Sequence, residues 1–225
     1  MKTMQKNILA LTVLATTSLP ALAESVDLRV TGVISPVACK PKLLGAGTID
    51  YGVIKTDTVS ATDYTQLDEK TLDFSINCEA PVKMAIVASD RRFNTSVGEQ
   101  RPYAAVNPTN TATALYGLGL DGAAKIGGYS LTIKPDSILA DNVKVSPIQR
   151  DANYPNWDTR GAGGLQNWYA PREISFAKPG TDVPISFTNL TAKLAVKALI
   201  NKGSELNLTK PVTLNGLATI ELVYL

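Results

Sequence analysis

The sequence predicts an all-β protein folded as a β-sandwich. Short apolar runs alternate with polar residues at the period of two that a half-buried strand requires. Clusters of glycine, asparagine and aspartate between these runs are typical of turns, and no long segment shows the 3.6-residue period of an amphipathic helix. Closely spaced strands separated by turns favour a sandwich. Because we find neither an internal repeat nor a linker, we expect one domain over residues 24–225.

The candidate strands follow one another along the chain. They are residues 26–34, 48–54, 72–78, 82–89, 115–120, 129–134, 143–148, 173–176 and 185–190. The next segment, 191–200, is compatible with a strand or a helix, because Leu194, Ala195 and Ala198 also share a helical face. We assign it to a strand, because the turn-forming residues 201–203 follow it.

The last candidate strand is the C-terminal segment 218–225. Its apolar side chains on one face are Ala218, Ile220, Leu222 and Tyr224, and Leu225 follows them. A terminal strand must pair both of its edges or leave backbone N–H and C=O groups open. Two interpretations therefore stand: an ordinary last strand within a sheet, or an edge to which another chain adds a strand.

The N-terminal segment has the features of an export signal. Lys2 and Lys6 form a short positive region, residues 8–19 are largely apolar, and the small residues Ala21 and Ala23 mark a cleavage site. We therefore predict a signal peptide over residues 1–23. The apolar run is too short and too rich in serine and threonine to span a membrane, so we expect an exported protein.

Charge and composition argue against several function classes. The chain has 22 Lys+Arg and 20 Asp+Glu residues, and the signal peptide contains two of the lysines, so the exported part is close to neutral. This balance argues against nucleic acid or an anionic membrane surface as a partner. The chain has no histidine, which removes the commonest general base and the Ser-His-Asp and Cys-His arrangements. We find no specific enzymatic or cofactor signal and expect a protein that is not an enzyme.

The two cysteines, Cys39 and Cys78, should form a disulfide in an oxidising compartment. Closing a loop of this length stabilises a fold by about 4 kcal/mol in the chain-entropy model. A metal site is the weaker interpretation, because two thiols without any histidine make a poor ligand set.

One segment, residues 150–172, departs from the strand pattern and predicts an irregular insertion. It contains the aromatic residues Tyr154, Trp157, Trp168 and Tyr169 among amide and charged side chains. Aromatic faces beside such groups could stack on a sugar ring and bond its hydroxyls, which predicts a glycan ligand. The alternative is that the rings fasten a long loop onto the sandwich.

Several segments together resemble fimbrial subunits of the chaperone–usher type. Residues 30–39 resemble the first pilin strand, which runs into the first cysteine, and residues 48–52 resemble the segment after it. Residues 72–78 resemble the strand that carries the second cysteine, and residues 218–225, with penultimate Tyr224, resemble the pilin C-terminal strand. The cysteine region is also similar to poorly characterised exported proteins of fimbrial operons. The resemblance covers both ends, about half of the chain.

This resemblance implies an immunoglobulin-like sandwich that lacks its final strand. A periplasmic chaperone would lend that strand, and at the outer-membrane usher the N-terminal extension of another fimbrial subunit would replace it. Ala218, Ile220, Leu222 and Tyr224 would then line the edge that meets the added strand, and the carboxylate of Leu225 would sit in a basic anchor. The implied location is the periplasm or a cell-surface fimbrium of a Gram-negative bacterium.

Two departures from the pilin pattern bear on mechanism. Only Glu24 and Ser25 precede the first predicted strand, so we expect a chain that accepts a strand but hardly donates one. Val212 stands where the family most often has glycine, and the nearest glycine is Gly216. The chain could be an end subunit, a non-polymerising relative or a self-complemented protein. We expect a fimbrial structural or accessory protein, with a carbohydrate-binding module as the alternative.

Overall fold

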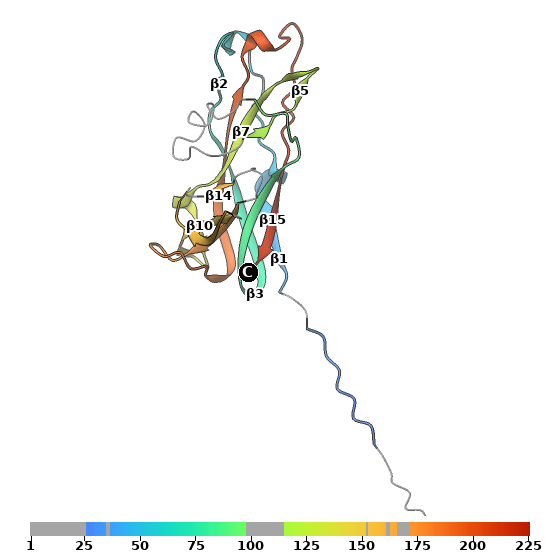
Figure 1. Cartoon of the computed structure of the whole chain (residues 1–225), viewed down its shortest axis with the longest axis vertical. Coiled ribbons are helices and arrows are strands. Elements are labelled where there is room, and N and C mark those ends of the chain that lie inside the picture. Colours follow the sequence, from blue (N-terminus) through green and yellow to red (C-terminus); the bar gives the residue numbers. More distant parts are fainter. Residues whose placement is uncertain (1–25, 35–36, 98–114, 152, 161–162, 166–171) are drawn as a thin grey trace, which may run out of the picture. The chain divides into compact units, whose positions relative to one another are not determined.

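The computed structural model describes residues 26–34, 37–97, 115–151, 153–160, 163–165 and 172–225 (Figure 1). The predicted signal peptide lies outside these residues. The chain divides into two units, residues 1–35 and 36–225. In the described part, no helix is long and apolar enough to cross a membrane.

The first unit is described only over residues 26–34, and these residues form no strand. The side chains of Val26, Leu28 and Val30 are 94%, 89% and 87% exposed. The prediction of a strand over 26–34 is therefore wrong for the chain by itself. The expectation that almost nothing precedes the first strand is wrong as well, because the first strand begins at Cys39.

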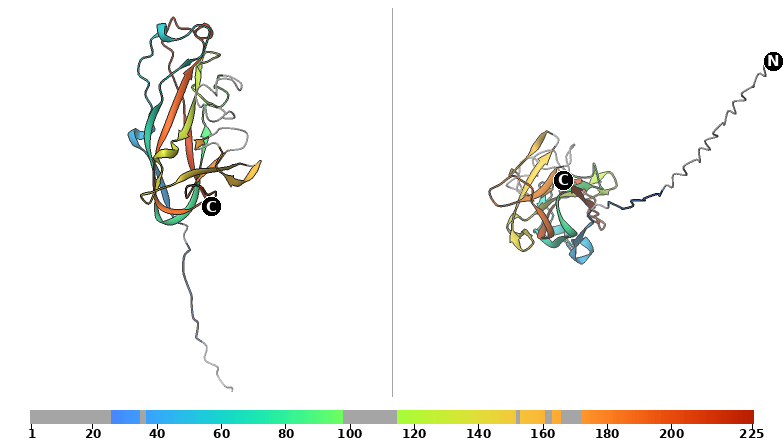
Figure 2. Two further views of the ribbon diagram at one scale, coloured as in Figure 1. Left: turned by 90° about the vertical axis from the view of Figure 1, so that its left-hand side faces the viewer. Right: turned by 90° about the horizontal axis from the view of Figure 1, so that it is seen from below.

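The second unit is an antiparallel β-structure, which confirms the predicted all-β sandwich. Its main sheet has thirteen strands, follows the order β11-β10-β13-β3-β14-β7-β12, and can be followed from two further sides in Figure 2. The described strands are β1 (Cys39–Leu43), β2 (Thr65–Gln66), β3 (Lys70–Asp90), β4 (Tyr116–Gly117), β5 (Leu120–Asp121), β6 (Ala124–Lys125), β7 (Gly127–Ile133), β8 (Leu139–Ala140), β9 (Val143–Lys144), β10 (Ser146–Asp151), β11 (Tyr154–Asp158), β12 (Gly164–Leu165), β13 (Glu173–Ala177), β14 (Ser186–Ile200) and β15 (Ala218–Tyr224). Short 3-10 turns cover Leu44–Gly47, Thr56–Thr58, Pro135–Ser137 and Gly203–Glu205.

The long strand β3 connects the two halves of the sandwich. Its first half pairs with β1 and β14, and its second half pairs with β15 and contacts β13. Phe74 and Ile76 from the first half and Met84 and Ile86 from the second are buried in one core. β1 and β15 are therefore both attached to β3, on different halves, and this places them at one open side of the sandwich.

The strand predictions hold where a strand has a partner within the chain. Residues 72–78 and 82–89 are parts of β3, and residues 185–200 fall almost entirely in β14, so the strand assignment of 191–200 is confirmed. Residues 48–54 form no strand, which corrects the prediction for that segment.

The segment 150–172 is less irregular than predicted. Tyr154–Asp158 forms β11, which pairs with β10 as a hairpin. The side chain of Asp151 fixes the turn, because its Oδ1 accepts the N–H groups of Asn153 at 2.9 Å and Tyr154 at 3.0 Å. Trp168 and Tyr169 lie outside the described residues.

Candidate functional site

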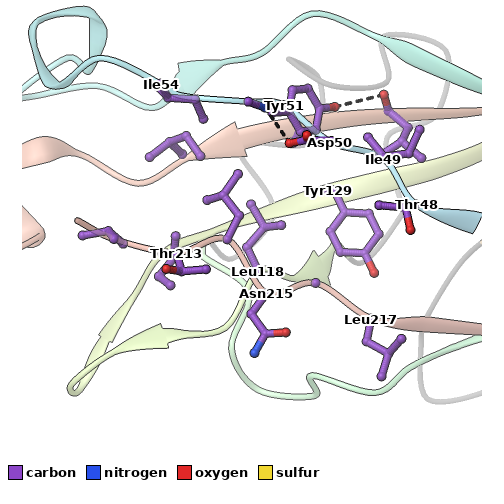
Figure 3. Close-up of a pocket in the computed structure, with 18 of the residues that line it drawn as sticks. Thr48, Ile49, Asp50, Tyr51, Ile54, Leu118, Tyr129, Thr213, Asn215 and Leu217 are labelled. Atoms are coloured by element: carbon purple, nitrogen blue, oxygen red, sulfur yellow. Dashed lines mark hydrogen bonds between the residues drawn. The ribbon is translucent and has the colours of Figure 1, made fainter.

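A large apolar groove lies along the open side of the sandwich. It has a volume of about 1430 Å³ and lies between residues 41–59 on one wall and residues 206–220 on the other (Figure 3). Its floor is formed by side chains of β3, β7 and β14, among them Phe74, Leu131, Leu194, Val196 and Ala198. These residues belong to the hydrophobic core, so the groove is an opening onto the core itself.

The first wall contains the segment 48–54, which is anchored by side chains instead of by strand pairing. Tyr51 donates its hydroxyl hydrogen to the carbonyl of Val196 at 3.3 Å, and the ammonium of Lys70 lies 5.2 Å from the centre of the Tyr51 ring. Lys70 Nζ also donates to the carbonyl of Asp50 at 2.5 Å. Burial raises the pKa of Tyr51, so this wall carries a neutral phenol at physiological pH. Segment 48–54 is held in place by these contacts, but its backbone belongs to no strand in the described structure.

The second wall, residues 206–217, is fixed to the body of the protein through Asn215. Its N–H donates to the carbonyl of Leu118 at 3.0 Å, and Arg92 donates to both its backbone and side-chain oxygens at 2.9 Å. The next residue, Gly216, packs so closely on Tyr129 that a Cβ there would lie 2.7 Å from the ring. Residues 211–217 also belong to no strand in the described part of the chain.

The strand β15 continues this second wall and leaves one of its edges open. Leu217 accepts the N–H of Arg91 at 2.9 Å, and the N–H of Leu225 reaches the carbonyl of Lys83 at 3.1 Å. Because backbone groups alternate between the two edges of a strand, the odd-numbered residues point at β3. The N–H and C=O groups of the even-numbered residues point to the other edge, where the described structure places no strand. These residues are Ala218, Ile220, Leu222 and Tyr224.

The structure distributes the predicted edge residues unevenly. Ala218 and Ile220 line the groove, whereas Leu222, Tyr224 and Leu225 lie beyond its lining. The side chains of Ala218, Ile220 and Leu222 pack against the core, while the backbone N–H and C=O groups of the same residues stay open at the strand edge. The sequence pattern located this strand, but gave no sign of the two unpaired wall segments beside it.

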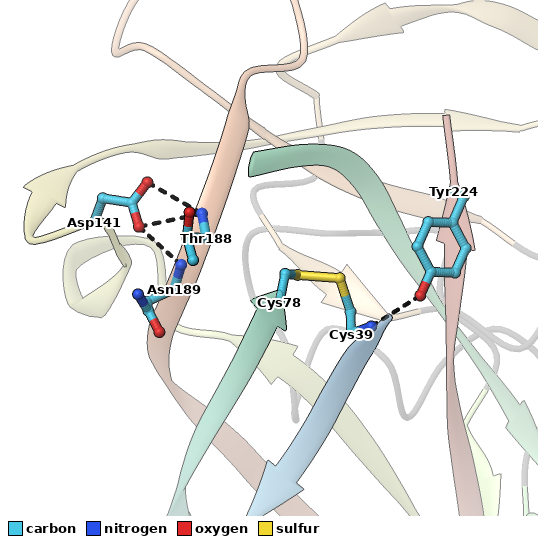
Figure 4. The surroundings of a disulfide bond; sticks show 6 residues. All are labelled: Cys39, Cys78, Asp141, Thr188, Asn189 and Tyr224. Carbon is cyan, nitrogen blue, oxygen red and sulfur yellow. Dashed lines mark hydrogen bonds between the residues drawn. A yellow bond between two sulfur atoms is a disulfide. The ribbon is translucent and has the colours of Figure 1, made fainter. Parts of the chain in front are cut away.

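The predicted disulfide is confirmed and lies at the base of the open side (Figure 4). Cys39 is directly opposite Cys78 in the β1–β3 ladder, with the two Cα atoms 4.0 Å apart. The N–H of Cys39 donates to the Tyr224 hydroxyl at 3.0 Å. This bond joins the start of β1 to the end of β15, so the two edge strands meet where the groove ends.

The described residues of the predicted ligand loop, Tyr154 and Trp157, are a separate feature and are not among the residues that line the groove. On β11, Tyr154 is 57% exposed and Trp157 is half-buried. The guanidinium of Arg160 covers the Tyr154 ring at 4.6 Å from its centre, and that of Arg150 covers Trp157 at 4.5 Å. Each described ring therefore already has one face occupied by a cation.

The fold and this groove define the class: an antiparallel β-sandwich protein that is open along one side. A family described as "Protein of unknown function (DUF1120)" matches residues 28–130. The chain is 30% identical over 222 residues to "Uncharacterized protein YhcF" of Escherichia coli (strain K12), which covers 89% of this chain and 90% of the relative. It is 28% identical over 241 residues to "Protein GltF" of the same organism, covering 96% and 94% of the two chains. The chain belongs to the DUF1120 family.

Proposed function

We propose that this protein is a fimbrial structural or accessory protein that receives a β-strand from another chain in a chaperone–usher pathway. The observation that carries the proposal is the groove of about 1430 Å³, whose walls contain the segments 48–54 and 211–217, which lack strand pairing. A strand placed there would cover the apolar floor with its side chains. Its backbone would pair with the open edge of β15.

The chain also contains a segment suited to occupy such a groove. Val26, Leu28 and Val30 alternate with Asp27 and Arg29, and the three apolar side chains are almost fully exposed. Exposed apolar side chains that recur on one face of an extended segment indicate an interaction surface. We therefore infer that the protein can donate a strand as well as accept one, contrary to the expectation from the sequence.

The proposed partners follow from this reading and from the resemblance to pilins. They are a periplasmic pilus chaperone, an outer-membrane usher and other fimbrial subunits. The predicted signal peptide supports export to the periplasm or to a surface fimbrium.

The proposal is tested by co-expressing the tagged chain with a periplasmic pilus chaperone and measuring co-purification. Ile220→Asp places a charge on a side chain that lines the groove, whereas Glu221→Ser changes the exposed neighbour on the opposite face. We expect the first variant to lose the chaperone, because burying an unpaired charge costs several kcal/mol, and the second to retain it. Formation of the disulfide serves as the control for folding. If the wild type retains no chaperone, or if both variants retain it equally, the proposal is wrong.

A carbohydrate-binding module is the second candidate. The exposed ring of Tyr154 on the edge strand β11 favours it, because an open aromatic face can stack on a sugar. The arginines on Tyr154 and Trp157 count against it, since each occupies a face that a sugar would need.

A further inference from the structure

We propose that Arg92 is a positioning residue of the groove, which aligns the second wall so that the open edge of β15 continues past the end of β3. This inference rests on the proposed function, in which that edge receives a strand from a periplasmic chaperone. It concerns the point where the second wall is fastened to the body of the protein, at Asn215 (Figure 3).

The strand β3 ends before the second wall does. β3 stops at Asp90, and one residue later the N–H of Arg91 donates to the carbonyl of Leu217 at 2.9 Å. Two residues earlier in the wall, the side chain of Arg92 takes over this role. Its Nε donates to the backbone carbonyl of Asn215 and its Nη2 donates to the side-chain oxygen of Asn215, both at 2.9 Å. The guanidinium therefore takes the place that the backbone of a paired strand would otherwise fill.

The turn that carries Arg92 is itself firmly held. Asp90 accepts the N–H of Arg92 at 2.7 Å and the N–H of Gly117 at 2.9 Å. The carbonyl of Arg92 accepts both the N–H and the hydroxyl of Thr95, at 3.1 and 2.7 Å. A Cβ added at Gly117 would overlap the Thr95 hydroxyl, so the turn packs directly on β4. The guanidinium therefore projects from a fixed base, as a residue that positions another must.

The second wall keeps the alternation of a strand beyond the start of β15. The N–H of Asn215 donates to the carbonyl of Leu118 at 3.0 Å, so Asn215 and Leu217 both direct their backbone groups at the body of the protein. By alternation, Leu214 and Gly216 direct theirs to the open side, as the even-numbered residues of β15 do. The open edge is therefore longer than β15 itself, and an added strand can pair along the wall as well.

Without Arg92, this part of the wall would have little to align it. In the described part of the chain, residues 212–214 make no hydrogen bond of their own. The next contact is at Lys210, whose ammonium lies 2.8 Å from a carboxylate oxygen of Asp121 at the end of β5. A partner that had to order a free segment would lose affinity, because ordering costs conformational entropy. Arg92 removes this cost by holding the wall in its aligned form before a partner arrives.

Two measurements on Arg92→Ala test this role. The first is the dissociation constant of the purified, disulfide-bonded protein for a periplasmic pilus chaperone. It should rise about tenfold, because one hydrogen bond to a charged group contributes about that much. The second is amide hydrogen exchange in the free protein, observed by NMR. Protection of the Asn215 N–H should fall, whereas the Leu225 N–H, which bonds to Lys83 at the far end of β15, should keep its protection.

The matched control is Arg91→Ala. It removes the same charge from the exposed neighbouring residue and leaves the backbone bond to Leu217 in place, so both measurements should stay at their wild-type values. Arg92→Lys keeps the charge but not the planar fork of donors, so it should recover only part of the affinity.

The failure of this inference and the failure of the proposed function are distinguishable. If Arg92→Ala keeps the wild-type protection at Asn215 or the wild-type affinity, or if Arg91→Ala loses as much affinity, the inference is wrong and the proposed function stands. Equal loss of protection at Asn215 and Leu225 would mean that Arg92 supports the whole fold, which also overturns the inference. If the wild type binds no chaperone, the proposed function is wrong and the inference with it. Should Arg92→Ala not fold, Arg92→Lys allows the same two measurements.

Discussion

Leu28 provides the sharpest test of strand insertion, because its side chain has no packing role within the described chain. It is 89% exposed, so replacing it should leave the stability of the free protein unchanged. If the side chain enters the groove, its burial contributes about 1.5–3 kcal/mol. Leu28→Ser should therefore weaken strand binding by roughly ten- to a hundredfold, since each 1.4 kcal/mol corresponds to a factor of ten.

The assay is the fluorescence anisotropy of a labelled peptide of residues 26–34, titrated with the protein. Three peptides are compared: the natural sequence, Leu28→Ser, and Arg29→Ser as the matched control. Arg29 points to the opposite face of an extended segment, so its replacement should change the dissociation constant by less than about threefold. Thermal unfolding of full-length Leu28→Ser protein checks that the fold itself is unaffected.

Two results would refute this reasoning. If Leu28→Ser binds as tightly as the natural peptide while Arg29→Ser does not bind, the opposite face of the segment enters the groove. If none of the three peptides binds, segment 26–34 is not a ligand of the groove.

The remaining predictions concern the base, the second wall and the β11 hairpin. Replacing Cys39 and Cys78 by serine should lower the free energy of unfolding by about 4 kcal/mol, measured by urea denaturation, because the bond closes a loop with a sequence separation of 39. Gly216→Ala should destabilise the fold by about 1–3 kcal/mol, measured in the same way, because the new methyl group would lie 2.7 Å from the Tyr129 ring. Trp157→Ala should leave glycan-array binding unchanged, because the proposed function does not use this ring.

Each of these predictions has its own control and its own contrary result. Gly32→Ala adds the same methyl group where no atom lies within 4 Å, so it should leave the free energy of unfolding unchanged. If both variants lose the same stability, close contact with Tyr129 is not the cause of the loss at Gly216. If the variant with serine at both cysteine positions is as stable as the wild type, the backbone pairing of β1 with β3 is sufficient to hold β1 in place. Glycan binding that disappears in Trp157→Ala would favour the carbohydrate-binding candidate.

The sequence by itself determined the features that depend on local pattern and covalent chemistry. Period-two alternation located β3, β14 and β15, because a side chain's face in a strand follows directly from its position in the run. Two cysteines and a predicted export signal were sufficient to predict the Cys39–Cys78 bond. These inferences need no knowledge of which segments lie side by side.

Only the tertiary structure decided which alternating segments find a partner within the chain. Residues 26–34 and 48–54 carry the same strand pattern as β3, yet neither forms a strand, because strand formation requires a neighbouring edge and the pattern specifies none. The hydroxyl of Tyr224 bonds to the backbone of Cys39 across 185 positions of sequence, a contact that no local pattern encodes. The groove is also a feature of the tertiary structure. Side-chain alternation determines which residues face the core, but the open side results from the pairing of β1 and β15 with different halves of β3.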